Sequence, residues 1–218
     1  MRTGRDDQEE PCPTRPSGSQ CDELRTGSDV NDLVIAILGG TGDQGRGLAR
    51  QFAPAGQPVI IGSRSAERAQ AAAAELNPGI QGMANADAAS GGGVVIAAVP
   101  WAAHAELLTG LRPHLAGKIV VDCVNPLGFD EREPYLLAVP EGSAAQQAAA
   151  LLPDSRVVAA FHHVSAKLLL DPEISRFDVD VLVLGEDREA TGIVQELAGR
   201  IPGVRGVYAG RLRNCRRD

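Results

Sequence analysis

Short apolar runs alternate with longer segments in which apolar positions recur three and four residues apart, from Leu33 to Tyr208. The runs of Val, Ile and Leu predict buried strands, and the helical spacing predicts helices between them. The expected strands are Leu33–Leu38, Val59–Gly62, a short one around Ile80, Val94–Val99, Lys118–Cys123, Arg156–Phe161, Asp180–Leu184 and Val204–Tyr208. The expected helices are Gln44–Ala55, Ala66–Leu76, a turn near Asn85–Ser90, Ala102–Leu115, Ser143–Leu151 and Arg188–Arg200. This alternation predicts an α/β fold with a doubly wound, mostly parallel sheet and a small C-terminal extension of that sheet or a subdomain.

Two segments lie outside the alternation. Residues 1–31 are rich in charge, Pro, Gly and Ser without periodicity, so they are expected to form a disordered leader. Two alternatives stay open: a regulatory arm, or a true translation start at a GTG codon for Val30. The stretch from Asn125 to Gly128 is expected to be a loop.

The first expected strand is followed directly by a glycine-rich turn and a helix. Gly40, Gly42 and Gly45 have the G-x-G-x-x-G spacing. In this context the first glycine permits a tight turn, the second lets the backbone approach a pyrophosphate, and the third lets the helix pack closely. The start of the helix, at Asp43 and Gln44, offers N–H groups and a positive dipole end to phosphates. The turn predicts a dinucleotide site; the alternative is a glycine turn that binds nothing.

The end of the second strand indicates which dinucleotide binds. An NAD enzyme usually carries Asp or Glu there, about 20 residues beyond the glycines, to bind the ribose hydroxyls. This chain has Ser63 and Arg64, with no acid until Glu67, and Arg68 follows one helical turn after Arg64. A hydroxyl and guanidinium groups bind a 2′-phosphate, which an acid would repel. We therefore predict NADP(H); in the alternative, Ser63 only caps the next helix and both arginines are solvated.

The rest of a dinucleotide should lie beyond the carboxyl ends of later strands. Val99, Pro100 and Trp101 follow one such strand, and Asn125 follows the next. Both loops are expected to flank the nicotinamide ribose, although Trp101 could equally be a packing residue. The two histidines of the helix after Trp101 are expected at the surface; they are His104 and His114.

His162 and His163 follow the expected strand Arg156–Phe161. In an extended segment they would point in opposite directions and could not both face one ligand. No Cys, Asp or Glu lies close to them in the sequence, so no metal site is predicted. One histidine is expected to donate a hydrogen bond to a carbonyl of a bound acceptor, unless the backbone satisfies it. No Lys or His paired with Asp is apparent for moving a proton from a hydroxyl, so hydride transfer between two ring systems is favoured.

Composition and charge limit the cellular compartments and the classes of binding partner that are expected for this protein. Net charge is -7 and the isoelectric point is near 5.1, which argues against nucleic acid and anionic membranes. No apolar run reaches the roughly 20 residues of a membrane-spanning helix, and the first thirty residues lack the apolar stretch of a secretory signal. The cysteines are scattered without C-x-x-C spacing, at Cys12, Cys21, Cys123 and Cys215. Neither zinc nor a disulfide framework is predicted, and a cytoplasmic protein is expected.

Five segments together resemble the NADPH-dependent F420 reductases, also called F420-dependent NADP oxidoreductases, in their actinobacterial form. These segments are Ile35–Gly45, Ile61–Arg64, Val99–Trp101, Phe161–Ala166 and Gly206–Asn214. The resemblance covers about Asn31 to Asn214. The Gly-Gly-Thr-Gly and Gly-Ser-Arg motifs are shared with cytosolic domains of some ferric reductases, whereas the proline-tryptophan and histidine-pair segments are more specific.

The resemblance implies hydride exchange between C4 of the nicotinamide of NADP(H) and C5 of the deazaflavin coenzyme F420. It also implies roles for individual residues. Thr41, Gly42, Asp43 and Gln44 would bind the pyrophosphate; Ser63, Arg64 and Arg68 the 2′-phosphate; Trp101, Asn125 and Ala166 would lie near the ribose and nicotinamide; and His162 would lie beside the deazaflavin. Residues 32–155 would form the NADP-binding domain, and residues 156–218 would complete the cofactor cleft.

Family members continue past the Arg-Leu-Arg-Asn segment into a helix that covers the cleft and contributes to a homodimer. This chain ends Asn214-Cys215-Arg216-Arg217-Asp218, so a truncated C-terminus, a more open cleft and a weakened dimer are expected. Two alternative functions stay open. One is an NADPH-dependent reductase of another acceptor, a flavin or a ferric chelate, and the other is a non-catalytic NADP(H)-binding remnant.

Overall fold

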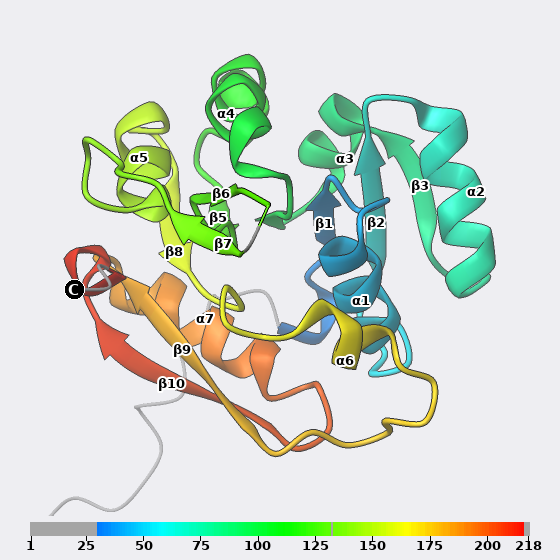
Figure 1. Cartoon of the computed structure of the whole chain (residues 1–218). Coiled ribbons are helices and arrows are strands. Elements are labelled where there is room, and N and C mark those ends of the chain that lie inside the picture. Colours follow the sequence, from blue (N-terminus) through cyan, green and yellow to red (C-terminus); the bar gives the residue numbers. More distant parts are fainter. Residues whose placement is uncertain (1–29, 132, 216–218) are drawn as a thin grey trace, which may run out of the picture.

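A single eight-stranded sheet forms the centre of the computed structural model, which describes residues 30–131 and 133–215 (Figure 1). Its strands are β1 (Ile35–Leu38), β2 (Val59–Ser63), β3 (Gln81–Ala84), β4 (Val94–Ala97), β5 (Ile119–Asp122), β8 (Arg156–Ala159), β9 (Val179–Gly185) and β10 (Val204–Gly210). The order across the sheet is β10-β9-β8-β5-β4-β1-β2-β3. Six strands are parallel, while β9 and β10 run the other way because β9 pairs antiparallel with β8. The mostly parallel, Rossmann-like α/β fold is therefore confirmed.

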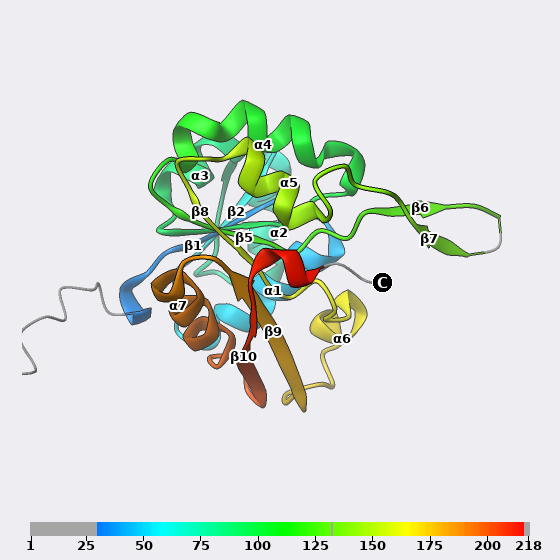
Figure 2. The same cartoon turned by 90° about the vertical axis from the view of Figure 1, so that its left-hand side faces the viewer.

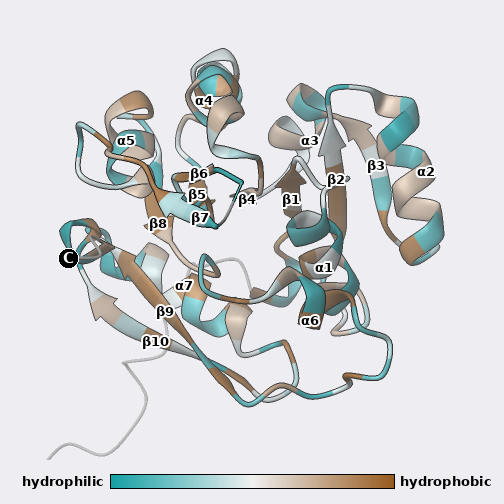
Figure 3. Cartoon of the chain, viewed as in Figure 1, coloured by the Kyte–Doolittle hydropathy of each residue, from teal (hydrophilic) through white to brown (hydrophobic). Residues whose placement is uncertain are grey.

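Helices cover both faces of the sheet. They are α1 (Asp43–Phe52), α2 (Ala66–Leu76), α3 (Asn85–Gly91), α4 (Trp101–Leu115), α5 (Ala144–Leu151), α6 (Ala166–Leu170) and α7 (Arg188–Ala198), with short 3₁₀ turns at Val30–Asp32 and Leu212–Cys215. Apolar side chains of α1, α2, α6 and α7 share one buried cluster with the sheet, and those of α3, α4 and α5 share the other. The outward helix surfaces are mostly polar or mixed, whereas the strands are mainly apolar (Figure 3).

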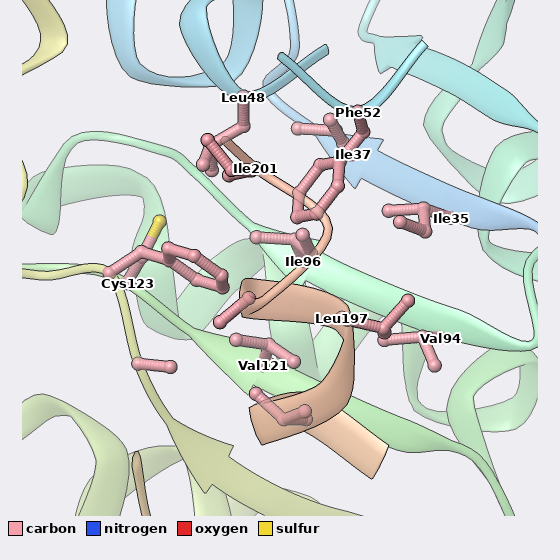
Figure 4. Close-up of a cluster of buried hydrophobic side chains, with 14 of the residues drawn as sticks. Ile35, Ile37, Leu48, Phe52, Val94, Ile96, Val121, Cys123, Leu197 and Ile201 are labelled. Atoms are coloured by element: carbon pink, nitrogen blue, oxygen red, sulfur yellow. The ribbon is translucent and has the colours of Figure 1, made fainter. Parts of the chain in front are cut away.

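The buried core on the α1 face joins early and late segments of the described chain. Ile35 and Ile37 of β1 pack with Phe52 of α1 and with Leu197 and Ile201 from the α7 segment, all fully or almost fully buried (Figure 4). Branched aliphatic side chains on a sheet that is covered on both faces are typical of parallel sheets. This packing fixes the long C-terminal segment against the glycine-rich half of the sheet.

The strand order reverses between β1 and β4. From β1 the chain proceeds outward to β2 and β3, and it then returns to β4 on the other side of β1. Loops at the carboxyl ends of these two strands diverge, and such a switch point is where open α/β sheets bind ligands. The same sheet continues past residue 155 because β8 pairs with β5. The division into residues 32–155 and 156–218 stays a prediction.

Several expected boundaries were wrong. The first helix ends at Phe52 and not at Ala55, and the third strand begins after Ile80. The expected loop at Asn125–Gly128 leads into a hairpin of β6 (Leu127–Phe129) and β7 (Pro134–Leu136), which projects from the body (Figure 2). Helix α6 was not expected either. The elements β6, β7 and α6 are each only three to five residues long, which is too short for a hydrophobic period to reveal them in the sequence.

Most of the expected leader lies outside the described residues. Val30 and Asn31 were assigned to it but belong to a 3₁₀ turn, in which Val30 is buried and its carbonyl accepts a hydrogen bond of 2.9 Å from Gln57 Nε2. For these two residues the expectation of disorder was wrong. No helix in the described part of the chain is long and apolar enough to cross a membrane.

Candidate functional site

The glycine-rich turn connects β1 to α1. The left-handed conformation in this turn lies at Gly39, with φ of 72°, just before the first glycine of the motif. A Cβ on Gly40 would lie 2.5 Å from Ile61 Cγ2, and a Cβ on Gly45 would lie 2.6 Å from Gly40 Cα. Both glycines are therefore required by packing within the protein.

Gly42 differs from its two neighbours in the motif. A Cβ there would meet only Gly39 O, at an ordinary contact distance of 3.5 Å. Gly42 is exposed and directly precedes α1, whose first N–H groups point out of the helix end. No contact within the described protein demands glycine at this position. The open space beside it fits the close approach of a phosphate group.

The predicted 2′-phosphate residues lie where β2 runs into α2. Ser63 is buried at the strand end, and Ser65 caps α2 by accepting a hydrogen bond from Arg68 N at 3.3 Å. The capping role thus belongs to Ser65, while Ser63 Oγ accepts only a long hydrogen bond of 3.5 Å from Ser65 N and keeps its own O–H as a donor. Arg64 and Arg68 are exposed, and neither guanidinium forms a hydrogen bond or ion pair with any described residue. The end of β2 therefore carries two guanidinium groups that have no partner among the described residues.

A cavity of about 300 Å³ lies at the switch point, between the turn after β1 and the loops after β4, β5 and β8. Its lining includes Gly42, Asp43, Gln44, Val99, Asn125 and His162. The structure thus brings together predicted site residues from four separate segments. Gly40, Thr41, Gly45, Ser63, Arg64, Arg68, Trp101 and Ala166 do not line it.

The turn after β8 has an unusual backbone. Phe161 has φ of 62°, a positive value that no other non-glycine residue in residues 30–131 and 133–215 adopts. The left-handed conformation costs an L-residue about 1–2 kcal/mol. Phe161 is held by its buried ring, which meets Phe52 edge-on at 6.0 Å, and by Gln44 Nε2, which donates to its carbonyl at 3.3 Å. This turn ties α1 to the segment that carries the histidine pair.

The two histidines do not point in opposite directions, so that expectation was wrong. Because Phe161 bends the chain, the rings of His162 and His163 meet edge to face at 5.1 Å. His163 Nε2 donates to Asp180 O at 2.9 Å, so the backbone holds this ring. Asn125 Nδ2 donates to the carbonyl of His162, which fixes the turn to the loop after β5.

A second, larger cavity of about 620 Å³ adjoins the first. Its walls combine apolar side chains from β7, β9 and β10 with the loops after β5 and β8. Val124, Asn125 and His162 line both cavities, whereas His163 lines only the larger one. His162 therefore lies at the junction between the two cavities.

His104 is buried, and its assignment to the surface was wrong; His114 is exposed as expected. His104 Nε2 lies 2.6 Å from Asp122 Oδ2, and His104 Nδ1 lies 3.1 Å from Gln147 Oε1. No local pattern in the sequence reveals this His–Asp pair, because the partners are 18 positions apart along the chain. Asp122 Oδ1 also accepts from Val124 N at 2.9 Å. The pair therefore supports the loop shared by both cavities.

Trp101 and Ala166 lie beside the cavities and not in their walls. Trp101 begins α4, and its ring stacks on His104 with centroids 5.4 Å apart. Ala166 begins α6, which packs on α1 through Leu169 against Gly47. The described residues contain no cluster of three or more His, Cys, Asp or Glu side chains that could hold a metal ion.

Burial lowers the pKa of His104, but the hydrogen bond and negative charge of Asp122 outweigh it and hold the pKa above its ordinary value. The folded state thus binds the proton more tightly than the unfolded state. We expect this contribution to stability to be complete below about pH 6.5 and to be lost as pH rises through the folded pKa. In urea unfolding experiments across this pH range, the free energy of unfolding should fall more with rising pH for wild type than for Asp122→Asn. Parallel pH profiles of the two proteins would contradict the assignment.

Comparisons with known proteins agree with this geometry. Residues 34–126 match the family described as NADP oxidoreductase coenzyme F420-dependent. The chain is 40% identical over 196 residues to the F420-dependent NADP reductase of Methanothermobacter thermautotrophicus, covering 84% of each chain. It is 40% identical over 195 residues to the enzyme of that name from Methanocaldococcus jannaschii, covering 84% of this chain and 86% of the other.

A solved structure gives the same result. The crystal structure of a candidate F420-dependent NADP reductase from Arthrobacter sp. superposes with a TM-score of 0.73 at 31% identity. The match covers 84% of this chain and 87% of the Arthrobacter chain. Relatives at this identity, matched over most of both lengths, establish the family. The chain belongs to the family of F420-dependent NADP reductases.

Proposed function

We propose that this protein is an oxidoreductase that exchanges a hydride between NADP(H) and the deazaflavin coenzyme F420. The observation that carries the proposal is the identity of 40%, over most of both chains, to relatives named for this activity. The two adjoining cavities support it, because they provide room for two ring systems with a shared boundary.

The residues of this chain fit NADP(H). The space beside Gly42 admits a pyrophosphate at the start of α1, where the N–H groups and the helix dipole favour an anion. Arg64 and Arg68 offer guanidinium groups without an internal partner for a 2′-phosphate, and Ser63 adds a hydroxyl. We assign the adenosine end to these residues. The nicotinamide end belongs to the smaller cavity, bounded by Val99 and Asn125.

The larger cavity is assigned to F420. Its lining includes Leu136, Leu182 and Leu184 together with residues of the loop after β5. The apolar part of this lining suits a flat aromatic ring, and polar side chains such as Asn125, Ser143 and Asn214 lie among the apolar ones. The two cavities share three lining residues, which are Val124, Asn125 and His162. Rings bound in the two cavities would therefore be neighbours at this shared boundary.

When bound, NADPH supplies a hydride from C4 and F420 accepts it at C5, with a proton taken up at the deazaflavin ring. The protein's part is to orient the two rings and to exclude water from between them. Asn125 holds the His162 turn through its hydrogen bond to the carbonyl. His162 presents its ring at the junction, where it can donate a hydrogen bond to a carbonyl of the acceptor.

Mixing the purified protein with NADPH and F420 and following deazaflavin absorbance tests the proposal. Parallel reactions with a free flavin and with a ferric chelate, each following NADPH oxidation, serve as comparisons. We expect F420 to be reduced much faster than either alternative acceptor. Reduction of the flavin or ferric chelate without F420 turnover would replace the proposed acceptor. Binding of NADPH with no oxidation by any acceptor would indicate a non-catalytic protein.

His162→Ala should lower kcat/KM for F420 by roughly tenfold or more, because one hydrogen bond to a polarised group contributes about 1.5 kcal/mol or more. NADPH affinity, measured by fluorescence titration, should stay nearly unchanged. His163→Ala is the matched control: it removes the donor to Asp180 O and should mainly lower thermal stability. Identical kinetics for the two variants, or loss of NADPH binding in His162→Ala, would contradict the assignment.

A further inference from the structure

Asn85 lies at the carboxyl edge of the sheet, next to the predicted 2′-phosphate residues. It directly follows β3 and is the first residue of α3. Strands β2 and β3 lie side by side (Figure 1). In their parallel pairing Ser63 is the partner of Ala84, so Asn85 follows directly after the residue that is paired with Ser63. Neighbouring strands are about 4.8 Å apart, which places Asn85 beside the entry to α2.

The glycine before Ser63 makes room for this side chain. A Cβ on Gly62 would lie 2.8 Å from Asn85 Oδ1, closer than such contacts allow. The same Cβ would lie 3.1 Å from Ala88 Cβ and 3.2 Å from Leu38 Cδ2. Gly62 is therefore the position at which the Asn85 amide packs onto β2. The Gly-Ser-Arg motif contains its glycine for this reason and not for backbone conformation, because Gly62 has no positive φ.

The Asn85 amide is held by packing but lacks hydrogen-bond partners among the described residues. Its Oδ1 is buried and has no hydrogen-bond partner among the described residues. Burying a carbonyl oxygen in this way costs about 1–3 kcal/mol. The residue as a whole is only half-buried, and Nδ2 donates to no described group. Oδ1 is the amide atom that lies against Gly62, and neither N–H of the NH2 group has a hydrogen-bond acceptor among the described residues, so both donors are available to a ligand.

We propose that Asn85 is a further specificity residue of the NADP(H) site, whose amide NH2 donates to the 2′-phosphate of the adenosine ribose. The inference rests on the proposed function only in taking NADP(H) as the ligand. A neutral donor adds to the charges of Arg64 and Arg68 without attracting other anions strongly, and it selects oxygen acceptors by geometry. The unsatisfied Oδ1 is then the cost of holding the amide in this orientation, as is common at binding sites.

Asn85→Asp tests the inference, because it keeps the shape of the side chain but replaces the donor with a negatively charged acceptor. We expect NADPH affinity, measured by calorimetry, to fall about tenfold or more, since donor and charge both turn unfavourable toward a phosphate. NADH affinity should change by less than about twofold, because NADH has no 2′-phosphate. Asn85→Ala should lower NADPH affinity by a smaller factor in the same direction.

Asn77→Asp is the matched control. Asn77 ends α2 at the opposite edge of the sheet, where its Oδ1 accepts from Gly79 N at 2.8 Å. The same charge change there should leave both affinities unaltered within about twofold, which separates direct contact from the long-range effect of charge. Gly62→Ala is a second, independent variant. Its Cβ would displace the Asn85 amide, so it should reduce the preference for NADPH while NADH binding is retained.

The outcomes distinguish this inference from the proposed function. Retention of the wild-type preference for NADPH by Asn85→Asp, or an equal loss for NADPH and NADH, would overturn the role of Asn85 alone. If wild type shows no preference for NADPH, the NADP(H) assignment falls together with this inference. If wild type binds NADPH selectively but does not reduce F420, the proposed hydride acceptor is wrong. The nucleotide affinities of the Asn85 variants would still decide the role of Asn85. Should Gly62→Ala fail to fold, the two Asn85 variants are sufficient.

Discussion

Asp122→Ala is expected to lower the free energy of unfolding by about 3–5 kcal/mol near neutral pH, the largest effect of any single substitution considered for this protein. The carboxylate is buried at the end of β5 and accepts from His104 and from Val124 N. Its removal leaves Nε2 of His104, whose side chain is fully buried, without its hydrogen-bond partner. It also leaves Val124 N without its acceptor, so the loop between the two cavities should loosen.

Urea unfolding at neutral pH measures this effect. Asp154→Ala is the control, because Asp154 is paired with Arg112 at 3.4 Å but both side chains are at least half exposed, at 66% and 50%. Exposed pairs contribute about 0–1 kcal/mol. A destabilisation of the Asp122 variant no larger than that of the Asp154 variant would show that the buried pair does not support the fold.

Arg64→Ala is expected to weaken NADPH binding by roughly 10- to 150-fold, which corresponds to a charge-assisted contact of about 1.5–3 kcal/mol. The guanidinium is exposed and has no partner among the described residues, so its removal should cost the folded protein little. NADH lacks the 2′-phosphate and should bind the variant about as well as it binds wild type. Wild type itself should therefore prefer NADPH strongly.

Fluorescence titration of both nucleotides at two salt concentrations measures this prediction. The difference between wild type and Arg64→Ala should shrink at high salt, because exposed charges are screened. Arg112→Ala removes an exposed arginine from the end of α4 and controls for the change in net charge. Equal affinity of wild type for NADPH and NADH would refute the assignment of Ser63 and Arg64 to a 2′-phosphate.

The alternation of apolar runs with helical periodicity determined the α/β class. The hydrophobic period of a strand or helix is visible in its own consecutive residues, so it can be read without knowledge of the fold. The dinucleotide motifs are local for the same reason. Gly40, Gly42 and Gly45 lie within one turn, and Ser63 with Arg64 ends one strand. Short elements such as β6, β7 and α6 lack such a pattern, because three to five residues are too few to show a period.

The contacts between distant segments were decided only by the tertiary structure. His104 and Asp122 form a pair because β4 and β5 are neighbours and α4 packs over them. Their separation along the chain does not indicate this contact. The left-handed Phe161 turned both histidines toward one cavity, where an extended segment would have separated them. Gly62 and Asn85 meet through the pairing of β2 with β3. A sequence specifies which groups are available and in what local conformation, but the distances between them arise when the sheet assembles and the helices pack on it.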